Sequence, residues 1–455
     1  MINSSPQPTP ITPPLSPPSI EVKRSPFKYF LTFFGLLLVL ILGWLLVTKV
    51  ILPRRVASTP PVTEIIYWGL WEPNEVLTSI FAQFENQNPG VKVNYVQQKS
   101  QDYRERLQTS FSSNQGPDLF RFHHTWVPML KNDLALLPSQ IYSSADFQTL
   151  FYPVANEWLK GNRGIYGIPL EIDGLGLFYN TTIFSSAGKT PPTTWEDLRV
   201  VAKQLAVINK EQLQRGGVAL GTTNNVEHWS DILGVMLLQN AADPAKPNNT
   251  NGQDALTFYV NFNTLDHVWD STMPPSTYAF ATEKVAMILA PSWRAFDIHD
   301  LNPNLRFAIA PIPQLPDSQP VNWASFWAEG VSSHSSKSKQ EIAWKLLQYL
   351  SQKETLRQLY AAASTVRLFG EPFSRVDMAD QLRGDQYTGA YISTAPTMKS
   401  WYLCSATHDN GLNDGIIKYY EDALNKILTG EPALKALTTT EQGIDQILSK
   451  YQVAR

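Results

Sequence analysis

The stretch YGIPLEIDGLGLFYN, residues 166–180, places two acids, Glu171 and Asp173, two residues apart in an otherwise apolar, glycine-studded run. A carboxylate is costly to bury in such surroundings unless a partner satisfies it. Residues i and i+2 of a strand share a face, so the two carboxyl groups meet the spacing of about 5–10 Å that a glycosidase pair needs. The stretch therefore leaves three alternatives open, which are catalysis, a requirement of the fold, and contact with a ligand.

Length and composition narrow the class of protein. A chain of 455 residues is long enough for two lobes or domains, each with its own core. Lys and Arg number 37 against 40 Asp and Glu, and the net charge of -3 provides no basic surface for nucleic acid. The single cysteine, Cys404, excludes an intramolecular disulfide framework, a cysteine-rich zinc site and an iron-sulfur cluster. No cofactor is expected.

The N-terminal residues read as a membrane anchor. Residues 1–28 include the proline-rich run SPQPTPITPPLSPP, for which a disordered tail is predicted. Residues 29–48 are predicted to be a transmembrane helix, because an uncharged apolar run of about 20 residues is what crossing the hydrocarbon requires. Residues 49–62, which contain Pro53, Pro60 and Pro61, are predicted to form a stiff linker.

The apolar span, residues 29–48, does not fit a cleaved signal peptide or a lipid-attachment signal. A cleaved signal peptide has a shorter apolar region, about 7–15 residues, followed by a small-x-small cleavage site. No cysteine follows the span closely, which excludes lipid attachment at a processed N-terminal cysteine. Charge leaves the orientation undecided, because basic residues flank both ends: Lys23, Arg24 and Lys28 before it, and Lys49, Arg54 and Arg55 after it.

The segment after the linker alternates between strands and helices. EIIYWGL and VKVNYV read as strands, and the apolar stripe of PNEVLTSIFAQFENQNPG marks a helix between them. YRERLQTSF continues as a helix and PDLFRF as a strand, so the pattern implies a parallel or mixed sheet. Ligands bind beyond the carboxyl ends of such strands, which makes the loops after Leu70 and Phe122 candidates for a site.

Later segments continue the α/β pattern. In AGKTPPTTWEDLRVVAKQLAVI, Thr193 and Glu196 lie three residues apart and predict a capping box at the start of a helix. QEIAWKLLQYLSQ and GIIKYYEDALNKILTG have helical periodicity. KVAMILAPSW, LRFAIAPIPQLP and WASFWAEGVSS read as strands or strand ends with aromatic termini.

Several of these segments, in this order, carry a family resemblance: FENQNPGVKVNY, PDLF, YGIPLEIDGLGLFYN, PPTTWEDL, ATEKVAMILAPSW, AIAPIPQLP, AWKLLQYLSQKE and ALNKILTG. Together they resemble the family 1 extracellular solute-binding proteins of bacterial ABC importers, the group that includes maltose-binding protein. The resemblance implies an α/β, two-lobed, type II periplasmic-binding-protein-like fold, with a mixed sheet flanked by helices in each lobe. It also implies that a ligand is trapped between the lobes by hinge closure.

On this resemblance, the opening stretch is the first crossing between lobes, and VNWASFWAEGVSS is the second. The expected division assigns residues 63–172 and 326–372 to the first lobe. Residues 173–325 and the C-terminal residues 373–455 are then expected to form the second lobe.

The site residues are implied by the same match. Asp173 corresponds to an acidic hinge residue that reaches the ligand in many members, and Trp293, in APSW, corresponds to a tryptophan that stacks on sugar. The other implied contacts lie in the loop after the first strand, at a strand end, in EHWSD and in the second crossing: Trp71, Glu72, Phe122, His124, Trp229, Trp323 and Trp327. Many members have glycines in the second crossing, so its aromatic residues indicate a more aromatic cleft. Flat aromatic faces and carboxylate acceptors are what a sugar needs.

The expected function is that of a monomeric, membrane-anchored receptor that binds a sugar or oligosaccharide and delivers it to the permease of an ABC importer. The soluble part is placed on the extracytoplasmic side of the cell membrane, mainly from the resemblance. Family members also bind polyols, glycerol phosphodiesters and other solutes, so the ligand class stays open. A sensory or scaffold role of the same lobe pair is a weaker alternative.

The main rival is a membrane-anchored glycosidase in which Glu171 and Asp173 act as acid and base. Such pairs usually come from separate elements, so no catalytic residue is expected and Glu171 is assigned a hinge or capping role. His123 and His124 are not expected to hold a metal, because adjacent strand residues point to opposite faces and no third ligand is near in sequence.

Overall fold

The computed structural model describes residues 26–51 and 62–453. Contacts within the chain divide it into two units, Met1–Pro61 and Val62–Arg455. The predicted proline-rich tail, apart from its last residues, and most of the predicted linker lie outside the described residues.

The described part of the first unit, residues 26–51, is one helix. It begins as α1 (Pro26–Leu46) and continues into a short π-helical segment, η1 (Val47–Ile51). Among the described residues, one stretch, Tyr29–Lys49, is long and apolar enough to cross a membrane. The side chains described in this helix are almost all exposed.

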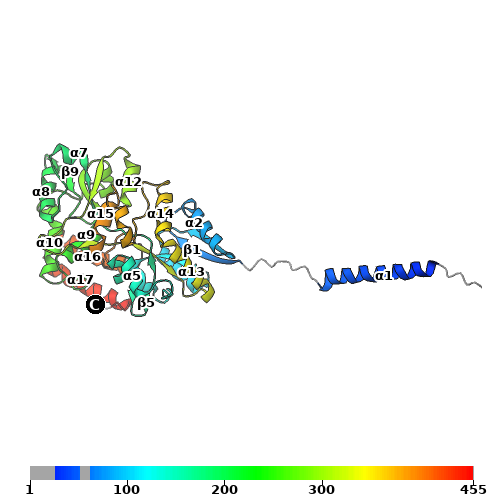
Figure 1. Ribbon diagram of the computed structural model, residues 1–455. Helices are drawn as coiled ribbons and strands as arrows, with labels where there is room; N and C mark the ends of the chain where they lie inside the picture. Colours follow the sequence, from blue (N-terminus) through cyan, green and yellow to red (C-terminus); the bar gives the residue numbers. More distant parts are fainter. Residues whose placement is uncertain (1–25, 52–61, 454–455) are drawn as a thin grey trace, which may run out of the picture. The chain divides into compact units, whose positions relative to one another are not determined.

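The second unit is built on two mixed sheets (Figure 1). In the first, the strand order is β2-β1-β3-β13-β6; β1 pairs in parallel with β2 and β3, whereas β13 runs antiparallel to β3 and β6. Its strands are β1 (Thr63–Gly69), β2 (Val91–Gln97), β3 (Leu119–His123), β6 (Ile168–Pro169) and β13 (Trp327–Val331). The predicted strand-helix alternation is confirmed, because α2 (Asn74–Gln87) and α3 (Tyr103–Ser112) connect the parallel strands. We call the part built on this sheet lobe 1.

The second sheet has the order β11-β7-β10-β9-β8. Here β7 pairs antiparallel with β10 and β11, and β9 pairs in parallel with β10. Its strands are β7 (Gly176–Asn180), β8 (Val207–Asn209), β9 (Gln212–Val218), β10 (Val285–Ala290) and β11 (Phe307–Ala310). We call the part built on this sheet lobe 2. In Figure 1 its β9 lies with α8 at the opposite side of the unit from β1 and α13.

The opening stretch of the sequence connects the two sheets. Strand β6 ends in the first sheet at Pro169 and β7 begins in the second at Gly176. Between them, Glu171 forms an isolated bridge with Phe373 and Gly174 forms one with Ala324. A Cβ at position 174 would lie 1.8 Å from the carbonyl oxygen of Trp323, so this close approach requires glycine. The chain therefore passes from the first sheet to the second within residues 169–176.

Two further segments run between the sheets. After β11, the chain forms the short strand β12 (Asn322–Trp323), which pairs with β14 (Met398–Lys399), and then enters the first sheet as β13. After α14 the chain returns through the 3-10 helix η3 (Val376–Gln381), which contacts α5. The hydroxyl of Tyr391, farther along, donates to the carbonyl of Ala290 at the end of β10.

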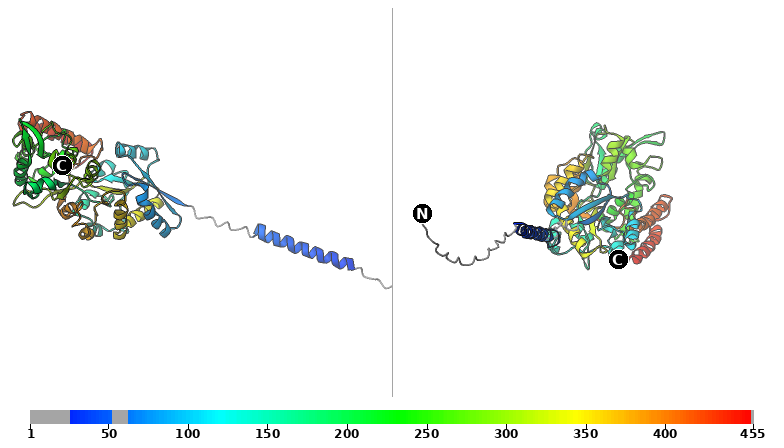
Figure 2. Two further views of the ribbon diagram at one scale, coloured as in Figure 1. Left: turned by 90° about the horizontal axis from the view of Figure 1, so that it is seen from above. Right: turned by 90° about the vertical axis from the view of Figure 1, so that its right-hand side faces the viewer.

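Helices flank both sheets. The long ones are α8 (Trp195–Leu205), α9 (Trp229–Gln239), α10 (Thr250–Thr264), α13 (Lys337–Leu350), α14 (Lys353–Ala363), α16 (Leu412–Leu428) and α17 (Ala433–Lys450). The short ones are η2 (His124–Trp126), α4 (Val127–Leu130), α5 (Ser144–Leu150), α6 (Pro153–Leu159), α7 (Thr181–Ser186), α11 (Ser276–Ala281), α12 (Arg294–Leu301), α15 (Gly389–Thr394) and η4 (Ala395–Thr397). A small hairpin, β4 (Lys160–Gly161) with β5 (Gly164–Ile165), completes the unit. In both views of Figure 2 the red C-terminal helices border the green part of lobe 2, where α16 and α17 contact α10.

One predicted helix start is off by a residue. Helix α8 begins at Trp195, and the side chain of Thr194 accepts the backbone N–H of Asp197 at 3.1 Å. The hydroxyl of Thr194 also donates to the Asp197 carboxylate at 2.7 Å. The predicted capping residue, Thr193, is one residue too early because TPPTTW offers two consecutive threonines and the pattern alone does not choose between them.

Candidate functional site

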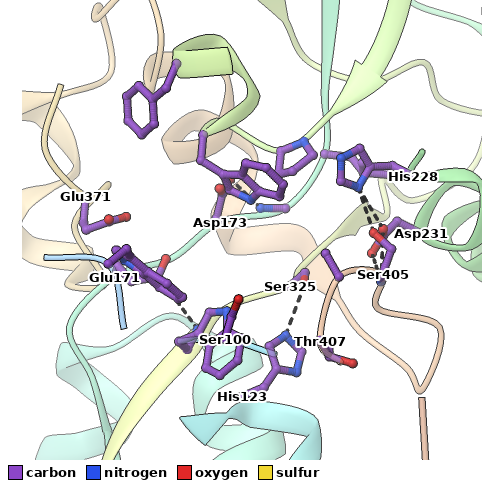
Figure 3. Close-up of a pocket in the computed structure, with 18 of the residues that line it drawn as sticks. Ser100, His123, Glu171, Asp173, His228, Asp231, Ser325, Glu371, Ser405 and Thr407 are labelled. Atoms are coloured by element: carbon purple, nitrogen blue, oxygen red, sulfur yellow. Dashed lines mark hydrogen bonds and ion pairs between the residues drawn. The ribbon is translucent and has the colours of Figure 1, made fainter. Parts of the chain in front are cut away.

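A pocket of about 340 Å³ lies where the crossing segments meet the strand ends of both sheets (Figure 3). Small-molecule sites have volumes of about 300–1,000 Å³. The pocket is lined by Trp71, Ser100, His123, Glu171, Asp173, Gly174, Leu175, His228, Asp231, Pro291, Trp293, Phe296, Ser325, Trp327, Arg367, Glu371, Ser405, Ala406, Thr407 and His408. Residues just beyond the carboxyl ends of β1, β3 and β10 contribute to it, where the parallel-sheet argument places ligands.

Three tryptophans form the flat walls. The rings of Trp71 and Trp327 meet edge to face, with 5.3 Å between their centroids. On the lobe 2 side, Trp293 keeps 36% of its surface exposed, and the Arg294 guanidinium lies 4.3 Å from its ring centroid. Phe296, one turn along α12, adds a fourth aromatic ring to the lining. Such rings offer the apolar surface on which the C–H faces of a sugar pack.

Below Trp71 lies a buried ion network. The Arg121 guanidinium sits 4.8 Å from the Trp71 ring and pairs with Glu72 at 2.7 Å and with Glu329 at 2.6 Å. The carboxylate of Glu72 therefore faces Arg121 and is absent from the pocket lining. Glu72 pairs with the cation that lies beside the Trp71 ring.

Asp173 has both carboxylate oxygens occupied. It accepts the backbone N–H of Gly174 at 2.8 Å, the backbone N–H of Ser292 at 3.1 Å and the Ser292 hydroxyl at 2.9 Å. Burial raises its pKa to about 7; these hydrogen bonds oppose that shift, and the nearby Glu371 adds to it. Asp173 lines the pocket, but its hydrogen bonds tie the first crossing to the loop after β10.

Glu171 has one carboxylate oxygen that can accept a hydrogen bond from a ligand. One carboxylate oxygen accepts the backbone N–H of Trp327 at 2.6 Å, and the other accepts no hydrogen bond from the described part of the chain. Burial raises the pKa of Glu171 well above its usual range, and the charges of Glu371 and Asp173 raise it further. For a ligand that donates hydrogen bonds, Glu171 is therefore better placed than Asp173, the reverse of the roles that the family match implies.

The opposite end of the pocket is a polar cluster. The Asp231 carboxylate accepts the indole N–H of Trp323 at 2.7 Å and the backbone N–H of Ser405 at 3.2 Å. The Arg294 Nε–H donates to His228 Nε2 at 2.9 Å, so the proton of a neutral His228 is on Nδ1, 2.8 Å from the Ser405 hydroxyl. Burial lowers the pKa of His228, which favours that neutral form.

The segment that closes this end is held in a costly conformation. Ala406 and His408 have φ values of 58° and 50°, the left-handed region, which costs a side-chain-bearing residue about 1 kcal/mol or more. Asp409, which is fully buried, accepts the backbone N–H groups of Gly411 and Asn413 and so anchors the segment to the start of α16. Strain held in this way is typical of sites.

Of the residues that the family match implies, Trp71, Asp173, Trp293 and Trp327 line the pocket. Phe122, His124, Trp229 and Trp323 do not. Phe122 is fully buried because alternation along β3 turns its neighbour His123 toward the pocket. His124 is buried against Phe326, 4.2 Å between ring centroids, and the nearly buried Trp229 opens α9.

Sequence reasoning missed part of the lining. Glu371, His228 and Asp231 were not singled out, nor was the segment 405–408. A signal existed for one pair: His228 and Asp231 lie three residues apart in EHWSD, so both face one side of the first turn of α9. Arg367 also lines the pocket and pairs with Glu371 at 2.7 Å.

Cys404 joins the two adjacent histidines in a buried cluster. Candidate ligand atoms of His123, His124 and Cys404 all lie within 4.8 Å of one another, so the third group that the sequence lacked nearby is supplied from 280 residues away. Each already has a partner: His123 Nδ1 lies 2.7 Å from the Thr125 hydroxyl, and His124 Nε2 lies 2.7 Å from the Ser400 hydroxyl, which also contacts the Cys404 thiol. Burial lowers the pKa of His124 to about 3 and raises that of Cys404. The geometry describes a hydrogen-bonded core cluster of neutral groups.

Comparison with known proteins decides the family. The family model described as bacterial extracellular solute-binding protein matches residues 71–356, more than half of the chain. The chain belongs to this family. This solute-binding protein is 21% identical over 312 residues to the maltotriose-binding protein of Pyrococcus abyssi, a match that covers 65% of this chain and 64% of that one. It is 24% identical over 255 residues to the multiple sugar-binding protein of Streptococcus mutans, covering 53% and 60% of the two chains.

Solved structures confirm the two-lobed fold of this solute-binding protein. The cyclic α-maltosyl-1,6-maltose binding protein of Arthrobacter globiformis superimposes with a TM-score of 0.71 at 18% identity, over 86% of this chain and 100% of that chain. The sugar-binding protein MalE of Xanthomonas citri gives a TM-score of 0.69 at 20% identity, over 86% and 98%. At these identities the likeness shows the fold, and the family and these neighbours are binding proteins.

Replacing Glu171 by glutamine is expected to remove a pH-dependent loss of stability. Because its folded pKa is raised, Glu171 favours folding below its unfolded pKa of about 4.3, and this contribution is lost as the pH rises toward the folded value. Glu171→Gln is neutral throughout, so the melting temperature of the unliganded variant, measured by calorimetry, should exceed that of wild type by about 1–3 °C at pH 8, and this difference should shrink toward zero as the pH falls to about 4.

The matched control for this comparison is Glu75→Gln, which removes an exposed carboxylate on α2. It should follow wild type across the same pH range. A difference between Glu171→Gln and wild type that stays constant from pH 8 down to about pH 4 would contradict the assignment of Glu171 as a buried group with a raised pKa.

Proposed function

We propose that this solute-binding protein is a membrane-anchored, extracytoplasmic receptor that binds a sugar or oligosaccharide between its lobes and delivers it to the permease of an ABC importer. The observation that carries the proposal is the pocket at the lobe crossings. It combines three tryptophan faces with the free carboxylate oxygen of Glu171. The printed names of the relatives and neighbours, which bind maltotriose, multiple sugars and a cyclic maltosyl-maltose, support a carbohydrate.

The way the pocket is assembled supports a receptor that closes. Trp71 and Trp327 belong to lobe 1 and Trp293 to lobe 2, so a ligand that touches all three bridges the lobes. A ligand shifts an equilibrium between open and closed states only by binding the closed state better. A bridging ligand does so, because the closed arrangement offers it both walls at once.

The helix of the first unit supports the anchoring part of the proposal. Tyr29–Lys49 is long and apolar enough to cross the hydrocarbon, and its described side chains are almost all exposed. Extraction of membranes from expressing cells at high pH, which strips peripheral proteins, should leave the full-length chain in the pellet. Recovery in the soluble fraction would contradict the anchor.

The glycosidase alternative receives less support. Its two acids lie on one crossing segment instead of facing each other across a bond, and Asp173 is held by Gly174 and Ser292. A general acid or base needs a carboxyl group that reaches the reacting atoms. We therefore assign the acids to binding and to the architecture of the crossing.

A ligand panel tests the proposal. Full-length protein in detergent is screened by thermal shift against glucose, maltose, maltotriose, cellobiose and larger maltodextrins, with glycerol and glycerophosphocholine as non-sugar solutes. At least one sugar should raise the melting temperature in a concentration-dependent way, because a ligand that binds only the folded state stabilises it. Stabilisation by no sugar, together with hydrolysis of a glycan, would overturn the receptor.

A further inference from the structure

The pocket lining is rich in carboxyl groups. It includes four carboxyl groups, on Glu171, Asp173, Asp231 and Glu371, against one guanidinium, that of Arg367. That guanidinium is ion-paired with Glu371 at 2.7 Å and is therefore committed to the protein. Two of these groups, Glu171 and Asp173, have raised pKa values, so their charged forms are favoured by a cation placed beside them and disfavoured by an anion. Sugar acids and phosphodiesters are disfavoured on this ground.

Two of the three histidines that line the pocket, His123 and His228, do not offset the carboxyl groups. Burial lowers the pKa of His123 well below its usual range, and it also lowers that of His228. Both imidazoles are therefore neutral at pH 7. The side chain of Arg294, behind Trp293, pairs with Asp297 at 2.7 Å.

Two of the four carboxyl groups are already used by the protein. Asp173 accepts from Ser292 and Gly174, and Asp231 accepts from the Trp323 indole and the Ser405 backbone. A charged group whose oxygens are filled by protein donors has less to offer a ligand.

The other two carboxyl groups have spare oxygens and lie together. The backbone of Glu171 pairs with Phe373, and the Ile172 N–H donates to the Pro372 carbonyl at 3.0 Å, so the Glu371 segment runs beside the first crossing. Figure 3 shows Glu171 and Glu371 on the same side of the pocket. Glu371 also contributes the largest charge effect on the pKa of Glu171. The structure gives each one oxygen, within the described chain, that accepts no hydrogen bond from a protein donor.

Aromatic rings lie beside this pair. The backbone N–H that Glu171 accepts belongs to Trp327, whose ring meets Trp71 edge to face at 5.3 Å. Carboxylates next to tryptophan rings combine charge-assisted hydrogen bonding with cation–π attraction, and both act on a cation. A neutral hydroxyl only donates a hydrogen bond to the carboxylate, and this bond is weaker than one from a cation.

We infer that the ligand of this pocket is an amino sugar or an oligosaccharide bearing a free amine, whose ammonium group is bound by Glu171 and Glu371 beside Trp71 and Trp327. The inference rests on the proposed receptor function and narrows its ligand class. The ammonium supplies three donors to carboxylate oxygens that the protein leaves without partners. It also brings a positive charge to the carboxyl groups of Glu171 and Glu371, which a neutral sugar does not.

The test compares sugars that differ at the amine. Isothermal titration of the full-length protein in detergent uses glucosamine, N-acetylglucosamine and glucose, and the matched disaccharides chitosan disaccharide, N,N′-diacetylchitobiose and cellobiose, with maltotriose as an unrelated neutral sugar. Amine-bearing sugars should bind about tenfold or more tightly than their acetylated and hydroxyl counterparts, since hydrogen bonds to charged groups contribute more than neutral ones.

Variants locate the effect. In Glu171→Gln and Glu371→Gln, the ratio of amine-sugar to neutral-sugar affinity should fall toward one, whereas in the charge-matched surface control Glu75→Gln it should stay at the wild-type value. Circular dichroism verifies that each variant is folded. A ratio that survives in both pocket variants would overturn the inference.

The remaining outcomes separate the inference from the proposed function. If maltotriose or another neutral sugar binds with an affinity equal to or higher than that of every amine sugar, the inference of an amine-bearing ligand is wrong, but the proposed receptor function is still supported. Binding of no sugar of either kind would overturn both.

Discussion

Arg121→Met is expected to lower the free energy of unfolding by about 3–5 kcal/mol, because it leaves two buried carboxylates without their ion-pair partner. The guanidinium pairs with Glu72 and Glu329, whose side chains are 8% and 1% exposed, and its own side chain is 5% exposed. Methionine keeps most of the apolar volume but supplies no charge. Chemical denaturation of the variant, followed by tryptophan fluorescence, measures the loss.

Two further variants make this prediction specific. Arg383→Met removes an exposed cation whose partner, Asp380, is 93% exposed, and it should cost about 0–1 kcal/mol. The double variant Arg121→Met with Glu329→Gln should be more stable than Arg121→Met alone, because it neutralises the carboxylate left buried without a partner. Equal stability of the single and double variants would show that the stranded charge is not the cause.

The same network explains why part of the site was predictable and part was not. Trp71 and Glu72 were both placed in the loop after β1 by the strand pattern, and that loop does reach the pocket. Which of the two neighbours faces the pocket depends on Arg121, whose position on β3 becomes relevant only when β3 pairs beside β1. A buried cation there draws Glu72 inward, and no local pattern records that.

The fold itself followed from local signals. The alternation of strands and helices after residue 62 indicated a parallel or mixed sheet, and the ordered family segments indicated two lobes; both are confirmed. The opening stretch crosses between sheets because Gly174 permits an approach to Trp323 that any side chain would block. Glu371 and residues 405–408 lie near the crossing in space but far from it in the sequence. No local sequence pattern around them predicts this proximity.

The second crossing shows a limit of alternation arguments. Trp323 and Trp327 are four residues apart, which on one strand would put them on the same face. The chain instead changes sheets between β12 and β13, so Trp323 is fully buried beside Gly234 while Trp327 lines the pocket. A Cβ at position 234 would lie 2.4 Å from the Trp323 ring, so this glycine reserves the space for the indole.

Trp293→Ala is therefore expected mainly to weaken sugar binding, whereas Trp323→Ala is expected mainly to destabilise the fold. Trp293 is 36% exposed and faces the pocket, so its truncation should weaken binding of the best sugar of the panel roughly 30- to 1,000-fold, about 2–4 kcal/mol, with a small change in stability. Trp323 is fully buried and donates to Asp231, so its truncation should cost about 3–5 kcal/mol of unfolding free energy.

Titration calorimetry and denaturation of the two variants, run side by side, give both quantities for each. Trp327→Phe serves as a milder companion, since it keeps a ring beside Trp71 and leaves the backbone N–H that Glu171 accepts. If Trp293→Ala binds the sugar as tightly as wild type, Trp293 is not a stacking surface and the lobe 2 wall of the site must be placed elsewhere. If Trp293→Ala instead unfolds as readily as Trp323→Ala, its ring belongs to the core, and its loss of binding would say nothing about contact with the ligand.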